Sequence, residues 1–198
     1  MSCMETICAR RSIRKFREQP VPRALTEEVI RAGTLAPSAK NRQPWQFVVA
    51  EGDAKEAAVR AMQDGLARER NEPFLPGSAR HLADAENTLR IMRSCPVLIF
   101  AVNPLAPGFE RPLSAEERVY DLCNAQSLGA ALENMSLAAC ELGLGSLWIC
   151  NTFFAQSELQ SWLKTDGELL AALALGYADE SPAARPRTEF SSVVEWRK

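Results

Sequence analysis

Several features that would point to common functions are missing from this chain of 198 residues. Its six cysteines form no C-x-x-C pair, and His81 is the single histidine. A structural zinc site needs about four closely paired ligands, so we expect no metal site. His81 lies in a polar stretch typical of a helix surface, which gives no basis for Ser-His-Asp or Cys-His catalysis. We interpret the cysteines as free thiols in a reducing compartment.

Signals of membranes and nucleic acids are also missing. No window approaches the roughly 20 apolar residues that span a bilayer, and the N-terminus, MSCMETICARR, lacks the apolar stretch of a signal peptide. A net charge of -2 and a pI near 5.6 argue against binding nucleic acid through bulk charge. No G-x-G-x-x-G follows a strand, so a Rossmann site is not supported. We therefore expect a cytoplasmic protein without membrane or nucleic-acid partners.

What the chain does have is enough apolar sequence for a core. Its composition is 46% hydrophobic and 24% charged, and its length suits one domain over residues 1–198. Separated strands among many helices indicate an α+β fold. We expect strands at 45–50, 97–102, 146–149 and 169–175. We expect helices at 4–11, 26–35, 53–70, 78–93, 114–142 and 155–163, with Thr26 and Asp53 as N-caps, loops at 71–77 and 103–113, and an irregular tail from 178.

The helix predicted at 114–142 is the most informative element. Ser114 and Glu117 match a capping box, and Gly143 and Gly145 can close the other end. At about 1.5 Å per residue it extends on the order of 40 Å. Its apolar residues occupy two nearly opposite faces, namely Leu128, Leu132, Met135, Ala139 and Leu142 on one and Cys123, Ala130 and Leu137 on the other. Such a helix is buried on both sides. We favour a homodimer interface over the alternative, a central helix within a monomer.

Two arginine clusters can bind an anion. In Arg10-Arg11-Ser12-Ile13-Arg14, alternate residues of an extended segment face the same way, so Arg10, Ser12 and Arg14 form a phosphate cradle. Arg185 and Arg187 form a second candidate clamp. Taken alone, each cluster is better explained as solvated surface charge.

Two further segments suit a flat ligand. The loop 36–45, APSAKNRQPW, has two prolines and several amide and hydroxyl groups that a heteroaromatic ring can meet at little ordering cost. In 142–149, LGLGSLWI, glycines between a helix and a strand allow close approach of a ring. The alternatives are an ordinary turn and a helix C-cap.

Together these segments resemble the nitroreductase family of flavoproteins. The match follows the family's order and spacing over most of the chain, and residues 51–93 and 103–120 match only loosely. The residues that carry it are RRSIRKF at 10–16, APSAKNRQPWQFVV at 36–49, LGAALENMSLAACELGLGSLWI at 128–149 and ALGYADESPAARPR at 174–187. The resemblance implies a mainly antiparallel mixed sheet flanked by helices, with the long helix at a dimer interface and FMN bound there by both subunits.

The resemblance also implies roles for individual residues. Arg10, Arg11, Ser12 and Arg14 would hold the phosphate, ribityl chain and pyrimidine edge, and Arg185 and Arg187 would complete the phosphate site. The partner subunit would supply Pro37, Ser38, Ala39 and Asn41. Asn87 and Arg90 would meet the pyrimidine edge, and Trp148 and Ile149 would line the ring. Lys40 departs from the family, which often has a small residue there, and places a cation near the site entrance.

The activity implied is transfer of hydride from NADH or NADPH, through flavin N5, to a nitroaromatic, quinone or related small-molecule acceptor. No side chain is then needed as a catalytic acid or base. Three alternatives stay open. They are a specialised reaction in the same family, such as dehalogenation, dehydrogenation or flavin fragmentation; a flavin-binding redox sensor without turnover; and a flavin-free binding protein.

Overall fold

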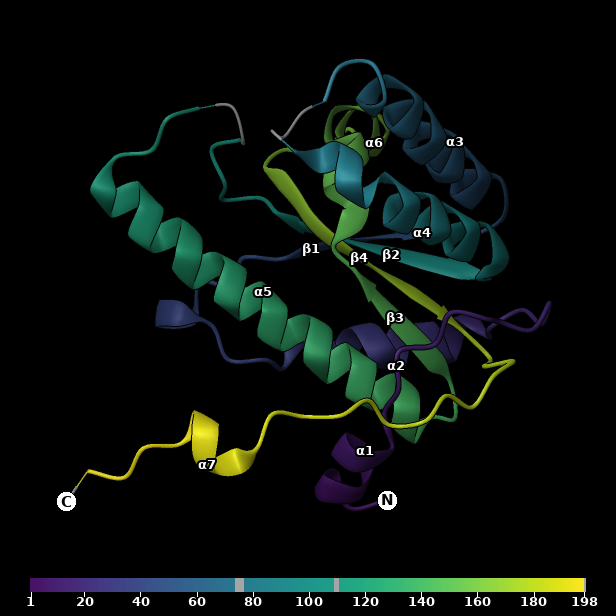
Figure 1. The fold of residues 1–198 in the computed structure, drawn as a ribbon, viewed down its shortest axis with the longest axis vertical. Coiled ribbons are helices and arrows are strands. Elements are labelled where there is room, and N and C mark those ends of the chain that lie inside the picture. Colours follow the sequence, from purple (N-terminus) through teal and green to yellow (C-terminus); the bar gives the residue numbers. More distant parts are fainter. Residues whose placement is uncertain (74–76, 109–110, 198) are drawn as a thin grey trace.

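The computed structural model describes residues 1–73, 77–108 and 111–197. Its centre is one antiparallel sheet in the order β1-β2-β4-β3 (Figure 1). The strands are β1 (Gln46–Ala50), β2 (Val97–Asn103), β3 (Gly145–Ile149) and β4 (Glu168–Gly176). The longer helices are α2 (Arg23–Thr34), α3 (Gly52–Glu69), α4 (Leu82–Ser94), α5 (Ala115–Glu141) and α6 (Gln156–Leu163), and the short ones are α1 (Cys3–Ala9), α7 (Phe190–Val193), η1 (Ala39–Asn41), η2 (Ser78–His81) and η3 (Asn151–Ala155). The α+β fold and all four predicted strands are confirmed.

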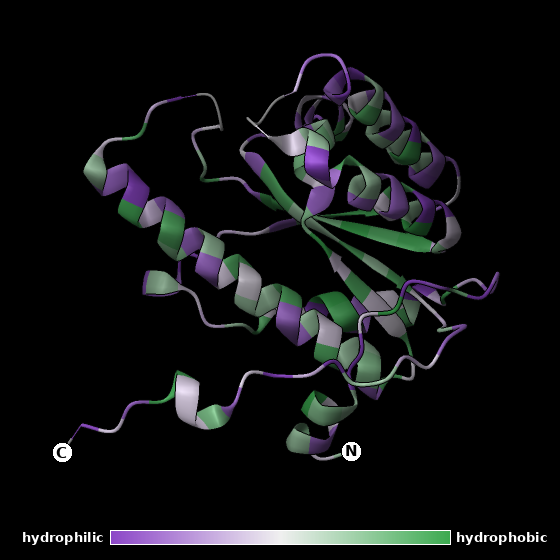
Figure 2. Ribbon diagram, in the orientation of Figure 1, coloured by the Kyte–Doolittle hydropathy of each residue, from purple (hydrophilic) through white to green (hydrophobic). Residues whose placement is uncertain are grey.

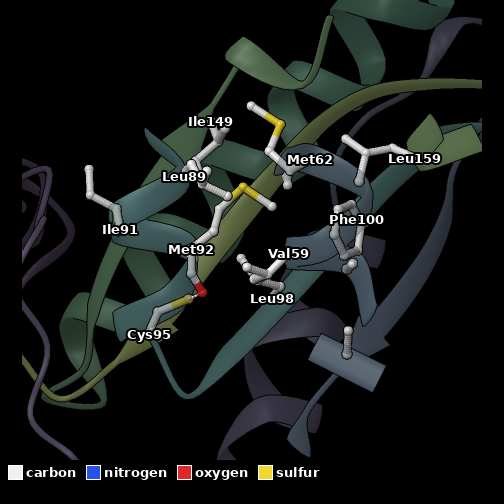
Figure 3. Packing of buried hydrophobic residues seen from close by; sticks show 14 of the residues in the cluster. Val59, Met62, Leu89, Ile91, Met92, Cys95, Leu98, Phe100, Ile149 and Leu159 are labelled. Atoms are coloured by element: carbon white, nitrogen blue, oxygen red, sulfur yellow. Dashed lines mark hydrogen bonds between the residues drawn. The ribbon is translucent and has the colours of Figure 1, made fainter. Parts of the chain in front are cut away.

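Helices cover both faces of the sheet, so the described chain has three layers. All seven residues of β2 are buried, because this strand lies inside the sheet with a helical layer on each side. Leu98 and Phe100 pack toward α3, α4 and α6 (Figure 3). Val97 and Ile99, which alternate with them, pack toward α2 and α5. β2 is correspondingly apolar over most of its length (Figure 2).

The long helix α5 forms as the sequence predicts. Ser114 Oγ accepts a hydrogen bond from the main-chain N–H of Glu117, and the Glu117 carboxylate accepts one from the main-chain N–H of Ser114. At the other end Gly143 has φ 74°, the left-handed conformation that ends helices at low cost for glycine. Gly145 instead begins β3. Leu128, Leu132, Met135 and Ala139 are buried against α2 and the sheet, whereas Cys123, Ala130 and Leu137 are half-buried.

Three predicted helix starts are wrong. α2 begins at Arg23 after Pro22, so Thr26 lies buried inside the helix and does not cap it. Pro22 has φ -57°, which suits the residue before a helix, so the helix begins one turn earlier than the capping residue Thr26 predicts. Asp53 lies in the first turn of α3, and Glu51 is at the N-cap position. The helix predicted over 78–93 is divided into η2 and α4.

The remaining segments are the predicted loops and the C-terminal tail. The loops predicted at 71–77 and 103–113 fall partly outside the described residues. The tail, predicted to be irregular, contains α7 and runs past the end of α5 away from the sheet (Figure 1). Phe190, Val193 and Trp196 on this tail are 69%, 66% and 80% exposed. Of the helices in the described part of the chain, none has the length and hydrophobicity needed to cross a membrane.

Candidate functional site

The segment after α1 is an extra edge beside β3. Ser12 forms a parallel bridge with Ser146, and Phe16 forms an antiparallel bridge with Ala178. Ile13 and Phe16 are 6% and 7% exposed and anchor the segment in the core. With Ile13 turned inward, the residues on either side of it stay half-buried at the surface. The alternation predicted from the sequence therefore has a physical basis in this anchoring.

One small pocket brings both predicted arginine clusters together. It has a volume of about 80 Å³ and is lined by Arg10, Arg11, Ser12, Arg14, Arg185 and Arg187, with residues 182–184 between them. We call it the arginine pocket. Glu180 holds the tail in place, because its carboxylate accepts hydrogen bonds from the main-chain N–H groups of Arg14 and Lys15. Glu180 was missed at the sequence level, since no local pattern marks an acidic residue that orders an arginine-rich tail.

The charges of the arginine pocket are largely uncompensated. Arg10 makes an ion pair with Glu133, with 3.4 Å between Nε and Oε1. Within the described ranges, no carboxylate makes an ion pair with Arg11, Arg14, Arg185 or Arg187. Instead Arg11 Nη1 donates to the carbonyl oxygen of Cys8 at 2.6 Å, and Arg14 Nη1 donates to that of Ser12 at 3.1 Å. Several guanidinium groups around one hydroxyl suit a phosphate dianion.

The loop of residues 36–45 lies outside the arginine pocket and has a strained backbone. Lys40, Asn41 and Gln43 have φ of 54°, 53° and 48°, which non-glycine residues rarely adopt. Ser38 Oγ accepts a hydrogen bond from the N–H of Gln43 at 3.0 Å. Ser127 on α5 holds the same loop, since its Oγ accepts from the N–H of Ala39 at 3.3 Å. Such strain is held where the surrounding structure imposes it, commonly at binding sites.

This loop does not reach the arginine pocket of its own chain. Of the four loop residues predicted to bind flavin, Pro37 and Asn41 are exposed and Ser38 and Ala39 half-buried. None of them lines the arginine pocket. The loop instead lies against the middle of α5 (Figure 1). Its expected role in the site of a partner subunit therefore stays a prediction.

The two residues predicted to line the flavin ring point to opposite faces of β3. Ile149 is 3% exposed and packs in the core beside Leu89 (Figure 3). Trp148 is 38% exposed. Its ring packs beside Gly129 of α5, where an added Cβ would lie 3.4 Å from Trp148 Cη2. Of this pair, Trp148 is the side chain available to a ligand.

Asn87 and Arg90 lie on the exposed side of α4, apart from the arginine pocket. Arg90 Nη2 donates to Asn87 Oδ1 at 3.1 Å. The neighbouring Thr88 connects this helix to the residues after β3, because Asn151 Nδ2 donates to its hydroxyl at 3.0 Å. The structure therefore places this amide and cation near the end of β3 that follows Trp148.

Comparisons with known proteins identify the family and the fold. The model of the Nitroreductase family matches residues 7–177, which end before Arg185 and Arg187. An NADH dehydrogenase of Thermus thermophilus is 28% identical over 198 residues, covering 95% of this chain and 92% of the relative. The crystal structure of a BluB-like flavoprotein from Clostridium difficile 630 superposes with a TM-score of 0.82 at 28% identity over 100% of both chains. An FMN and NADPH-dependent nitroreductase, NfnB from Sphigopyxis sp. strain HMH, shares the fold with a TM-score of 0.80 at 22% identity, again over 100% of both chains. The strand order, the arginine pocket and the extent of the family match lead to one conclusion: the chain belongs to the nitroreductase family.

Proposed function

We propose that this protein is an FMN-dependent oxidoreductase that carries hydride from NADH or NADPH to an electron-poor aromatic or quinone acceptor. Membership of the nitroreductase family supports an oxidoreductase function for this chain. The flavoprotein and the FMN and NADPH-dependent nitroreductase with the same fold support FMN and a nicotinamide as the cofactors. The observation that carries the proposal is the arginine pocket, in which two distant arginine clusters meet and, within the described residues, only Arg10 makes an ion pair with a carboxylate.

The residues present fit the phosphate of FMN. Arg10, Arg11, Arg185 and Arg187 supply planar donors, and Ser12 adds a hydroxyl at the same pocket. The pocket is small, so it suits the phosphate group of the cofactor and leaves the ring to lie outside it. When bound, FMN supplies a ring nitrogen that accepts hydride from one substrate and gives it to another.

The protein's own contribution is binding and electrostatics. The arginine pocket fixes one end of the cofactor, and the exposed face of Trp148 offers an apolar surface for the other. Arg14 or Arg90 supplies the cation at the pyrimidine edge, where positive charge stabilises the negative charge of the reduced state. In this scheme no side chain of the chain transfers a proton as catalytic acid or base.

A homodimer belongs to the same proposal. Val119 and Leu122 on α5 are 59% and 58% exposed, and Met4 and Ile7 on α1 are 65% and 46% exposed. The side chains on these two helices lie near the two ends of α5, since α1 is joined to its C-terminal end by a hydrogen bond from Thr6 to Glu141. The tail adds three more exposed apolar side chains, Phe190, Val193 and Trp196. Exposed apolar side chains of this kind mark interaction sites. A second copy would cover them and would bring the 36–45 loop to the site of its partner.

The first test is an absorbance spectrum of the purified protein, followed by anaerobic addition of NADH or NADPH. Flavin bands that bleach on addition support the proposal and identify the donor. Flavin bands that persist favour a sensor or a specialised reaction instead. A protein without flavin bands, even after FMN is added, contradicts the proposal and leaves a flavin-free binding protein.

A further inference from the structure

A second pocket lies between the start of β4, the amino-terminal half of α5 and the segment that precedes α5. Its volume is about 390 Å³, and small-molecule sites usually have volumes of about 300–1,000 Å³. Its wall includes Pro107, Pro112, Leu113, Arg118, Asp121 and Glu168. We call it the Glu168 pocket. It shares no residue with the arginine pocket or with the loop of residues 36–45, so the proposed function gives it no role.

Glu168 is a buried carboxylate without a partner. The residue is 7% exposed, and within the described ranges its carboxylate makes neither a hydrogen bond nor an ion pair. The large majority of buried polar side-chain atoms in proteins do have a partner. Glu168 lines the pocket and its two oxygens keep accessible surface, so a ligand can reach them. A ligand that donates hydrogen bonds would supply the missing partner.

The charges around Glu168 make the pocket negative when this carboxyl is ionised. Asp121 on α5 lines the same pocket, and its charge acts on the Glu168 carboxyl. Arg111 also lines it but is paired with Glu117, with 2.6 Å between Nη2 and Oε1. Arg118 is the other cation of the described wall. Two carboxylates therefore stand against one available cation, which leaves an excess of one negative charge.

This excess suits a monocation that carries N–H donors. A protonated primary amine has three such donors, and its hydrogen bonds to a carboxylate are strengthened by charge. Pro107, Pro112 and Leu113 supply apolar surface for a short carbon chain. A divalent metal ion fits poorly, because Mg²⁺ and Ca²⁺ take about six or more oxygen ligands. Among the described residues, no group of three or more acidic, cysteine or histidine side chains is placed to hold a metal ion.

From this arrangement we propose that the Glu168 pocket binds a small aliphatic primary amine as its protonated monocation. The ammonium group lies on the Glu168 carboxylate, and the carbon chain lies against Pro112 and Leu113. This ligand is additional to the cofactors and acceptor of the proposed function, and its binding does not depend on them.

The bound amine replaces a proton on Glu168. Burial, with a smaller effect from Asp121, raises the pKa of this carboxyl to about 7, so about one tenth of it is ionised at pH 6 and about nine tenths at pH 8. The groups that neighbour Glu168 are Asp121 and Arg118 from α5, Arg111 from the segment before α5, and the neutral Asn103 opposite it on β2. An alkylamine resembles a lysine side chain, whose pKa is about 10.4, and stays protonated at both pH values. Binding therefore tightens as the pH rises from 6 to 8.

The test is isothermal titration calorimetry of the purified protein with three probes of equal chain length. n-Hexylamine has the charge and the donors, 1-hexanol lacks the charge, and N,N,N-trimethylhexylammonium keeps the charge without an N–H. At pH 8 we expect the amine to bind at least about tenfold more tightly than either analogue. Its affinity should fall about tenfold at pH 6. Equal affinity for hexylamine and hexanol, or no heat of binding with hexylamine, would overturn the proposal.

The released proton gives a second readout. At pH 7, titrations in two buffers with different heats of ionisation should show about half a proton released for each amine bound, because about half of Glu168 is protonated before binding. Amine binding without proton release would place the ammonium on some other group and overturn the assignment to Glu168.

Variants assign the effect to residues. Glu168→Gln should remove both the preference for the amine and the proton release. Arg118→Gln, at an exposed position, should tighten amine binding, because it removes a cation that repels the ammonium. Glu116→Gln removes an exposed carboxylate of α5 outside the pocket and is the control that should keep the wild-type preference.

An unchanged preference for the amine in Glu168→Gln overturns the proposal. If that variant does not fold, Arg118→Gln decides, since an affinity that is unchanged or weaker than that of the wild type contradicts the charge argument. Because heat is measured, either result is independent of whether flavin bleaching supports or contradicts the proposed reductase.

Discussion

The main-chain N–H of Ile13 donates a hydrogen bond of 2.9 Å to the carbonyl oxygen of Ser146. This bond joins the N-terminal segment to the edge strand β3, and the buried Ile13 side chain lies against Gly145. Positions on either side of Ile13 face the arginine pocket. The geometry of that pocket therefore depends on the contacts of Ile13 with Gly145 and Ser146 in the core below it.

Replacing Gly145 tests this dependence. A Cβ at Gly145 would lie 2.8–3.0 Å from three atoms of Ile13, so Gly145→Ala must displace that side chain. Overpacking of a core costs about 1–3 kcal/mol of stability. We expect a loss of that size in chemical denaturation and weaker FMN binding in a fluorescence titration. Gly129→Ala is the control, since its Cβ would meet Trp148 at 3.4 Å, an ordinary contact. If both variants bind FMN like the wild type, the segment is not held by this contact.

The arginine pocket predicts a charge-specific loss of cofactor affinity. Arg187→Ala and Arg10→Ala each remove charge-assisted hydrogen bonds to phosphate, worth about 1.5–3 kcal/mol. The Kd for FMN should rise by about 10–100-fold in a titration of the flavin-free protein. Arg23→Ala removes the same charge from an exposed residue paired with Glu27 and should leave the Kd unchanged. Full FMN retention by both pocket variants at low flavin concentration would show that the phosphate assignment is wrong.

Glu168 makes stability depend on pH. Burial, together with a smaller effect from the charge of Asp121, raises the pKa of this carboxyl to about 7. In the unfolded chain the group has an ordinary, lower pKa, so between the two values the folded protein holds the extra proton. Stability from this group is therefore lost as the pH rises toward and through 7.

Glu168→Gln should remove that loss. In thermal unfolding, we expect the variant to be more stable than the wild type at pH 8 and to differ little near pH 4.5. Glu28→Gln, at an exposed carboxylate on α2, should follow the wild type at both values. The same Tm difference between Glu168→Gln and the wild type at pH 4.5 and pH 8 would argue against a protonated, buried Glu168.

The exposed apolar face of α5 predicts a dimer that one charge disrupts. Leu122 is 58% exposed, and in a two-fold interface each substitution acts twice. Burying a leucine contributes about 1.5–3 kcal/mol, so Leu122→Arg should weaken association at least about 100-fold. Sedimentation velocity would show monomers where the wild type is dimeric, whereas Ala54→Arg on the exposed side of α3 should remain dimeric. A monomeric wild type would refute the interface outright.

The sequence by itself determined the elements whose causes are local. The apolar sequence of β2 predicts a buried strand. The capping box at the start of α5 joins Ser114 and Glu117, which are only three residues apart in the chain. The family motifs predicted the antiparallel sheet flanked by helices, which hydrophobic periodicity alone does not specify. Local reasoning failed at Thr26, because a capping residue inside a helix looks the same as one at its start.

Tertiary structure alone decided which distant groups meet. Arg14 and Arg187 share a pocket because the sheet order places β3 at an edge, where the N-terminal segment pairs with it and the tail leaves β4 nearby. The inward direction of the Ile149 side chain and the burial of Asn124 Oδ1, which has no hydrogen-bond partner among the described residues, likewise depend on what packs against them. Hydrogen bonds within a few residues leave a sequence signature, whereas contacts across the fold depend on the packing of whole layers.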